Sequence, residues 1–162
     1  MNTGKRFKTE KELIEDFINS GIVRGWFLQE IPVGIKVLED ILSLRHSREE
    51  LEILRKKLGP FLRRIDLVCV EGIDRPPLKP RFHEWLRIRE ELRGHNVWIF
   101  EAKKALNAEA LGEILINEYL FRKDNPEINV VGKGIICGTK DVQGILIGEA
   151  CKAYGVKIFD KF

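Results

Sequence analysis

Residues 96–103 read NVWIFEAK, an apolar run that ends in the charged triplet Glu101-Ala102-Lys103. Valine, isoleucine and aromatic residues favour extended backbone, so the run predicts a β-strand. Because successive side chains point to opposite faces of a strand, Glu101 and Lys103 should share one face and Ala102 the other. The chain contains one Glu-x-Lys triplet, and its place at the end of this apolar run, rather than its composition, carries the signal.

A second apolar run carries a charged residue in its interior. Residues 64–70 read RIDLVCV, and Asp66 interrupts a segment that is apolar at both odd and even positions. Such a segment is typical of a strand in the middle of a sheet that is covered on both sides. If this strand lies beside the first, Asp66 joins Glu101 and Lys103, and two carboxylates and an ammonium converge at one edge of the sheet.

Charges inside a covered strand cost free energy unless they are paired or coordinate a metal ion. Mg²⁺ takes one or two carboxylates, keeps several waters and accepts phosphate oxygen, and Mn²⁺ is a substitute. We expect Asp66, Glu101 and the main-chain carbonyl of Ala102 to bind the metal. Lys103 is expected to orient or help deprotonate the attacking water, or to stabilise the phosphate. The alternative is that all three are strand-end charges, with Lys103 in a salt bridge to Glu101 or Asp66.

The remaining pattern predicts one α/β domain over residues 1–162, with a mixed central sheet flanked by helices. Thr9 and Glu12 form a capping box that opens a helix, and residues 26–33 read as a strand. After the triplet the order is helix, strand, helix, strand, which implies parallel pairing through crossover helices. Helical additions are expected at about 35–60 and 74–94. The later elements are expected at 107–122, 130–137, 141–153 and 156–159.

The composition is that of a globular protein with a heavily ionised surface. Of 162 residues, 44% are hydrophobic and 33% charged, and the net charge of +3 is compatible with nucleic acid without indicating it. No apolar run approaches the ~18 residues that span a bilayer. The three cysteines lack C-x-x-C spacing, which favours buried thiols and a reducing compartment. We therefore expect a cytoplasmic protein with no membrane association.

At Asp66, Glu101 and Lys103 the chain resembles the PD-(D/E)xK, or restriction-endonuclease-like, nucleases. The predicted order from Thr9 onward is similar to the core of that superfamily, although its proline before the first acid is replaced by Ile65. The resemblance implies a restriction-endonuclease-like core and a Mg²⁺-dependent nuclease that hydrolyses phosphodiester bonds in DNA, with RNA as an alternative substrate. A non-catalytic relative that binds nucleic acid or protein is the alternative function.

Two helices add local similarities. Residues 10–14, EKELI, are similar to the first helix of archaeal junction resolvases, which implies that Glu10 approaches the metal. A solvated first-turn acid is the alternative for Glu10. Residues 110–115, ALGEIL, resemble the helix after the motif strand in RecB-like nucleases, which carries Gln and, four residues later, Tyr. Here those places hold Glu113 and Asn117, which is a departure from that branch.

A basic segment over residues 75–93 contains Arg81, Arg87 and Arg89 with interleaved aromatic residues. It could form an arm that tracks DNA phosphates beside the site. The alternatives are an amphipathic helix with a solvated face and a homodimer contact. Lys104, next to the triplet, is either a further phosphate contact or a solvated charge.

Overall fold

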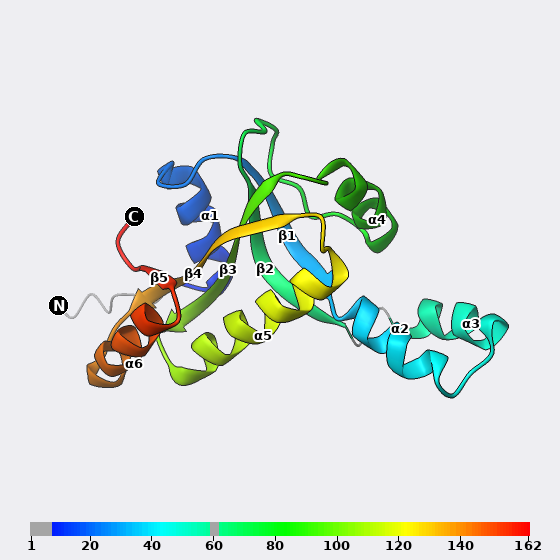
Figure 1. Ribbon diagram of the computed structural model, residues 1–162. Coiled ribbons are helices and arrows are strands. Elements are labelled where there is room, and N and C mark those ends of the chain that lie inside the picture. Colours follow the sequence, from blue (N-terminus) through cyan, green and yellow to red (C-terminus); the bar gives the residue numbers. More distant parts are fainter. Residues whose placement is uncertain (1–7, 59–61) are drawn as a thin grey trace.

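The computed structural model describes residues 8–58 and 62–162, which form an α/β fold with a five-stranded mixed sheet in the order β1-β2-β3-β4-β5 (Figure 1). The strands are β1 (Trp26–Val33), β2 (Arg63–Val70), β3 (Asn96–Ala105), β4 (Asn129–Thr139) and β5 (Val156–Phe159). The helices are α1 (Glu10–Ser20), α2 (Ile35–Ser43), α3 (Arg48–Leu58), α4 (Phe82–Glu91), α5 (Ala108–Asp124) and α6 (Val142–Ala153). The predicted mixed sheet flanked by helices is confirmed.

The sheet changes from antiparallel to parallel pairing at β3. Strands β1, β2 and β3 pair antiparallel, whereas β3, β4 and β5 pair parallel through the crossover helices α5 and α6. A parallel neighbour requires a long connection, which α5 and α6 supply. The pairing of the second half and the contact between the two charged strands are therefore both as predicted.

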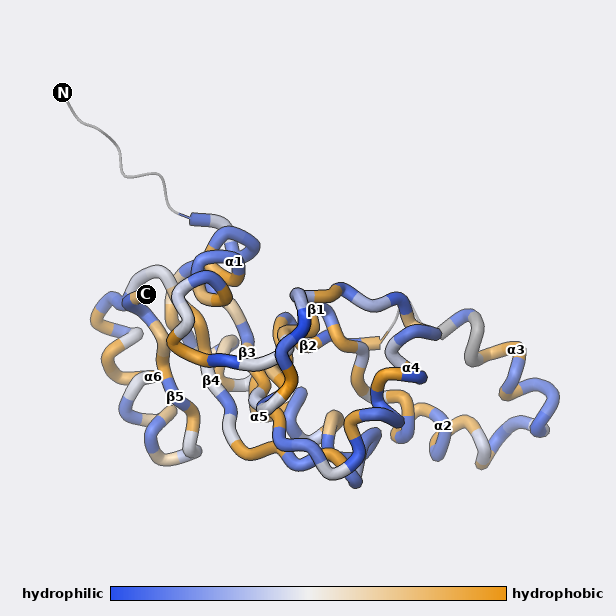
Figure 2. Tube along the Cα trace, turned by 90° about the horizontal axis from the view of Figure 1, so that it is seen from above, coloured by the Kyte–Doolittle hydropathy of each residue, from blue (hydrophilic) through white to orange (hydrophobic). Residues whose placement is uncertain are grey.

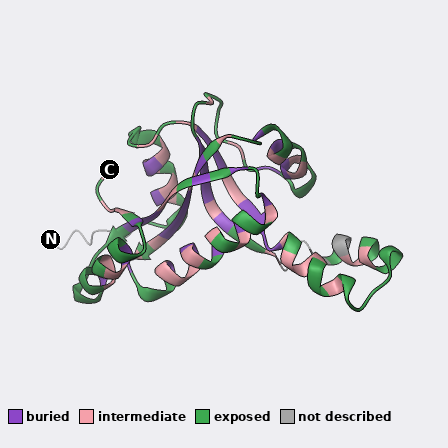
Figure 3. Ribbon diagram, viewed as in Figure 1, coloured by how far each residue is buried: buried purple, intermediate pink, exposed green. Residues whose placement is uncertain are grey.

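Helices cover both faces of the sheet and enclose two apolar cores. On one face α1 packs Leu13 and Phe17 against Leu67 and Phe100. The other face is covered by α4, α5 and α6, and its larger core includes Phe121. In Figure 3 the buried residues follow the strands and the inner sides of these helices.

The middle of β2 is covered on both sides, as its sequence indicates. Residues 67–70 are all fully buried, and they alternate between the two cores.

The helix boundaries also follow local chemistry. Thr9 caps α1, its hydroxyl accepting from the Glu12 N–H at 3.1 Å while the Glu12 carboxylate accepts from the Thr9 N–H. The predicted capping box is confirmed. The three cysteines are free and buried, again as predicted.

The alternation of side chains breaks at one point in β1 and at the point opposite in β2. The residues of these strands in the larger core are Trp26, Leu28, Ile31, Val33, Ile65, Val68 and Val70. In β1 the core residues are even-numbered up to Leu28 and odd-numbered from Ile31. In β2 the core residue before Asp66 is the odd-numbered Ile65, and those after it are the even-numbered Val68 and Val70. The change falls at Glu30, whose φ is 53°, and at Asp66. Such irregularities re-aim a side chain within a sheet, so the sequence period alone does not give the direction of Asp66.

Helices α2 and α3 connect β1 to β2 and extend away from the sheet (Figure 1). Both carry a mixture of hydrophobic and hydrophilic residues, as Figure 2 shows. The carboxylate of Asp124, at the end of α5, caps the start of α2 by accepting from the backbone N–H groups of Gly34 at 2.8 Å and Lys36 at 2.7 Å. The structure thus contains the predicted addition near 35–60, although its residues 59 and 60 lie outside the described residues.

The second addition covers the outer edge of β1. Leu78 forms a parallel bridge with Leu28, and its backbone exchanges hydrogen bonds with Gln29 at 2.9 Å and Phe27 at 3.0 Å. Covering an edge strand blocks pairing with another chain there. The predicted amphipathic helix follows as α4, which buries Trp85 and Ile88.

Candidate metal centre

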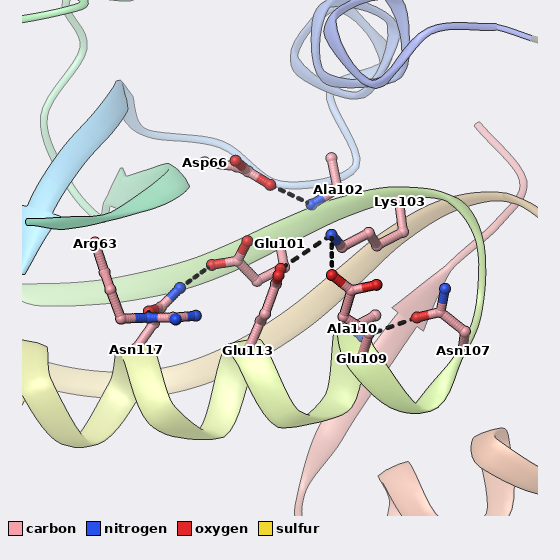
Figure 4. A network of polar contacts seen from close by, with 10 residues as sticks. All are labelled: Arg63, Asp66, Glu101, Ala102, Lys103, Asn107, Glu109, Ala110, Glu113 and Asn117. Atoms are coloured by element: carbon pink, nitrogen blue, oxygen red, sulfur yellow. Dashed lines mark hydrogen bonds and ion pairs between the residues drawn. The ribbon is translucent and has the colours of Figure 1, made fainter. Parts of the chain in front are cut away.

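Asp66 and Glu101 lie side by side where the β2–β3 ladder ends. The register pairs Leu67 with Phe100, so the next residues in each strand, Asp66 and Glu101, face each other. The Oδ2 atom of Asp66 accepts a hydrogen bond from the Ala102 N–H at 2.8 Å (Figure 4). The two carboxyl groups are also close enough for each to affect the pKa of the other. The structure therefore brings together the two acids that the sequence singled out.

Burial makes this pair of carboxyl groups difficult to ionise. Glu101 is only 2% exposed to solvent. Burial, with the negative charge of Asp66, raises the pKa of Glu101 to about 9. Burial also raises the pKa of Asp66, although the N–H of Ala102 opposes that effect. In the protein alone, Glu101 therefore holds its proton at neutral pH.

The backbone of Ala102 lies beside the two carboxyl groups. Its N–H points toward β2 and donates to the Asp66 side chain, because the backbone pairing of β2 with β3 has already ended at Leu67 and Phe100. In an extended strand the N–H and C=O of one residue project to the same side. The carbonyl of Ala102 is consequently directed toward the side on which Asp66 lies.

Asn117 and Arg63 extend the network from the other side of Glu101. Asn117, on α5, is 1% exposed and donates from Nδ2 to Oε1 of Glu101. Its Oδ1 atom accepts from Nε of Arg63 at 3.0 Å (Figure 4). Neither Asn117 nor Arg63 was predicted from the sequence to belong to the site. The available signal was the four-residue spacing of Glu109, Glu113 and Asn117, which places them on one face of α5.

Lys103 reaches the same side of the sheet as Glu101 but pairs with α5. Its Nζ atom lies 3.1 Å from Oε2 of Glu113 and 3.7 Å from Oε1 of Glu109. The alternative of a salt bridge to Glu101 or Asp66 is wrong, because the ion-pair partners of Lys103 among the described residues are these two acids. Burial lowers the pKa of Lys103, but the ion pair with Glu113 outweighs burial and the pKa is raised. Lys103 is thus a cation at neutral pH.

Glu10 lies near this lysine rather than within the carboxyl pair. It is the first residue of α1 and is exposed, and its negative charge is one of those that raise the pKa of Lys103. Among the residues that the structure describes, no three His, Cys, Asp or Glu side chains are grouped so as to hold a metal ion. Glu10 therefore lies on the side of Lys103 and outside the pair formed by Asp66 and Glu101.

The arginines of the basic segment lie at the other end of α5. Trp85 of α4 packs on Phe121, with ring centroids 6.2 Å apart, whereas Lys103 pairs with Glu109. Twelve helical residues, or roughly 18 Å, separate Phe121 from Glu109. The structure does not bring Arg81, Arg87 and Arg89 together with Asp66. Lys104 is exposed on β3.

Comparison of the chain with protein-family models, with curated protein sequences and with solved structures finds no match. No helix in the described ranges is long and apolar enough to cross a membrane.

Proposed function

We propose that the protein is a metal-dependent nuclease with a restriction-endonuclease-like core, as its resemblance to the PD-(D/E)xK superfamily implies. The observation that carries the proposal is the meeting of Asp66 and Glu101 at the end of the β2–β3 ladder, with Lys103 on the same side of the sheet. A helix on one face, three antiparallel strands and a crossover helix into a parallel strand also agree with the predicted order.

The donor set fits a hard divalent cation. Asp66, Glu101 and the Ala102 carbonyl offer only oxygen atoms, which suit Mg²⁺ and Mn²⁺. The raised pKa of Glu101 supports the fit, because a buried pair of carboxylates needs a positive partner and Lys103 pairs with Glu113 instead. Mg²⁺ commonly uses one or two carboxylates and keeps several waters, so a third acid is not required.

Each residue then has a defined task. Asp66, Glu101 and the Ala102 carbonyl would hold the metal, whose chemistry is to activate water and neutralise charge on a phosphate. The N–H of Ala102 fixes the Asp66 carboxylate, and Asn117 fixes that of Glu101. Lys103, being protonated, acts as a hydrogen-bond donor and positive charge toward the phosphate rather than as a base. Glu113 and Glu109 hold its ammonium group in place.

One observation favours a second candidate, a non-catalytic protein of this fold that binds nucleic acid or another protein. Glu101 is hydrogen-bonded to Asn117 and Lys103 is ion-paired to Glu113, so these groups are satisfied by the protein itself. A polar network without catalytic use would have the same contacts. For the nuclease, and for a non-catalytic protein that binds nucleic acid, we propose DNA as the ligand, with RNA as the alternative.

The deciding experiment measures Mg²⁺-dependent cleavage of DNA by wild type, Asp66→Asn and Glu101→Gln, with Mn²⁺ binding followed by calorimetry. Both variants should lose Mn²⁺ binding and cleavage while remaining folded, because each loses a charged ligand. Glu71→Gln is the matched control. Glu71 accepts a hydrogen bond from Trp98 at 3.0 Å, as Glu101 accepts one from Asn117, but it lies outside the metal centre.

Cleavage by wild type and by both variants at the same rate would indicate a contaminating nuclease and contradict the proposal. Mn²⁺ binding that depends on Asp66 and Glu101, without cleavage of DNA or RNA, would favour the non-catalytic candidate.

A further inference from the structure

Arg63 is a cation next to the metal centre that the nuclease motif leaves without a task. It is the first residue of β2, is exposed, and its side chain crosses to the α5 side of the sheet (Figure 4). There its Nε atom donates to Oδ1 of Asn117 at 3.0 Å, and Asn117 in turn donates to Glu101. One amide group therefore separates the guanidinium of Arg63 from a carboxylate that would hold the metal.

The hydrogen-bond partner of Arg63 is the neutral amide of Asn117, which does not balance the positive charge of the guanidinium. Two other cations beside the acids of α5 have carboxylate partners: Lys103 pairs with Glu113 at 3.1 Å and Arg122 with Glu118 at 3.0 Å. Arg63 is bonded instead to a neutral amide, and in the described part of the chain no carboxylate pairs with it. A guanidinium has five N–H donors, of which the bond to Asn117 uses one. Both terminal nitrogens are thus available on an exposed side chain.

We propose that Arg63 forms a phosphate-binding subsite, in which its terminal nitrogens bind a backbone phosphate of the nucleic acid whose neighbouring phosphate lies at Asp66 and Glu101. The subsite rests on the proposed function. Arginine matches phosphate with two parallel hydrogen bonds, and its Nε bond to Asn117 fixes the plane of the guanidinium beforehand. Asn117 then holds both a metal ligand and the phosphate-binding group, so one buried amide sets their spacing.

Arg64 provides a matched control in the next position of the strand. It is also an exposed arginine bonded to a neutral oxygen, the backbone carbonyl of Glu30, at 3.1 Å. It makes no contact with Asn117 or Glu101. Arg63→Gln and Arg64→Gln therefore remove the same charge from adjacent residues, and only the first removes it from the network around Glu101.

The experiment measures the affinity for a fluorescent DNA duplex in Ca²⁺, with the DNA verified as intact, over a series of salt concentrations. Arg63→Gln should weaken binding about tenfold and lower the slope of log affinity against log salt by about 0.9, the value for one lost phosphate contact. Arg64→Gln should change both quantities less. Arg63→Lys should restore the slope but not the full affinity, because lysine keeps the charge and lacks the Nε bond.

Calorimetry with Mn²⁺ alone separates a phosphate contact from a structural role. Arg63→Gln should bind Mn²⁺ as wild type does. Equal losses of DNA affinity in Arg63→Gln and Arg64→Gln would overturn the subsite, and so would a parallel fall in Mn²⁺ affinity, which would make Arg63 a support for Asn117. A wild-type protein that binds Mn²⁺ but no nucleic acid would overturn the proposed function as well.

Discussion

Glu101 lies beside α5 and Glu118 belongs to it, and the two glutamates differ in the charges of the side chains that surround them. The side chain of Glu118 is 14% exposed and lies between Lys133, whose Nζ is 2.7 Å away, and Arg122, at 3.0 Å. Burial raises the pKa of Glu118, but its two cations outweigh burial and the pKa is lowered. Glu101 is more deeply buried, has an acid and an amide as neighbours, and has a raised pKa.

The difference shows what a purely structural carboxylate looks like in this protein. Where Glu118 serves packing, the chain supplies the counter-charge from its own side chains. Where Asp66 and Glu101 meet, it supplies a second negative group and one hydrogen-bond donor to each carboxyl. A charged pair built in this way requires a proton or a cation from solution.

The largest effect is expected from a pair of lysines that each bind a glutamate of α5. The side chain of Lys103 is 18% exposed and pairs with Glu113, and that of Lys133 is 17% exposed and pairs with Glu118. Lys103→Ala should lower the single-turnover cleavage rate at least about 10²-fold, the cost of losing one donor to the transition state, with Mg²⁺ affinity nearly unchanged.

Lys133→Ala is the control, and it should lower stability while leaving the rate per folded molecule intact. The measurement is single-turnover cleavage across a Mg²⁺ titration. A Lys103→Ala variant that reaches the wild-type rate at saturating Mg²⁺ would end the catalytic assignment of Lys103.

The next effect concerns the free energy of unfolding, which replacement by glutamine should raise at Glu101 and lower at Glu118. Because the folded-state pKa of Glu101 is raised, folded protein retains a proton that unfolded chains release above about pH 4.5. Metal-free protein should therefore lose stability as pH rises from about 4.5 to about 9, by up to about 1.4 kcal/mol per pH unit. Glu101→Gln should remove this dependence and be more stable than wild type at pH 8.

Glu118→Gln should instead destabilise the protein at neutral pH by about 1–3 kcal/mol, since it leaves Lys133 and Arg122 without their carboxylate partner. The lowered pKa of Glu118 means that its contribution is present above the ordinary pKa and is lost as pH falls through the lowered value. Urea denaturation at pH 5, 7 and 8 without metal compares the two variants. Destabilisation by both at pH 8 would show that Glu101 is an ionised structural carboxylate.

The smallest effect is the stabilisation of the folded protein by the metal itself. A ligand that binds only folded protein adds about 1.4 kcal/mol at ten times its Kd. Mg²⁺ should raise the Tm of wild type and of Glu118→Gln, and should not raise that of Asp66→Asn. An equal rise in all three proteins would place the bound ion elsewhere.

The sequence predicted much of the fold because its signals are local. The capping box at Thr9 and the apolar runs around Asp66 and Glu101 appear as α1, β2 and β3 in the structure. The parallel half followed from the alternation of strands and helices. The break in side-chain alternation at Glu30 was not predicted, because it depends on how two strands twist against each other rather than on either sequence.

At the site, the sequence identified residues that stand out within one element and missed those that act across elements. Asp66 and Glu101 are charges in apolar runs, so each is visible alone. Arg63 and Asn117 are 54 positions apart, and they come into contact only because α5 packs beside β2. The alternative that paired Lys103 with Glu101 or Asp66 failed for the same reason, because Glu113 becomes its neighbour only through packing.

The connection between β1 and β2 has a consequence for how the length of this chain can change. Val33 and Arg63 already face each other in the sheet, although 29 residues lie between them. The free energy of closing a loop varies slowly with its length, so this connection can lengthen or shorten at little cost to the sheet. Helices α2 and α3 therefore behave as a module inserted at a permissive position, where sequence can diverge while the surroundings of Asp66 are preserved.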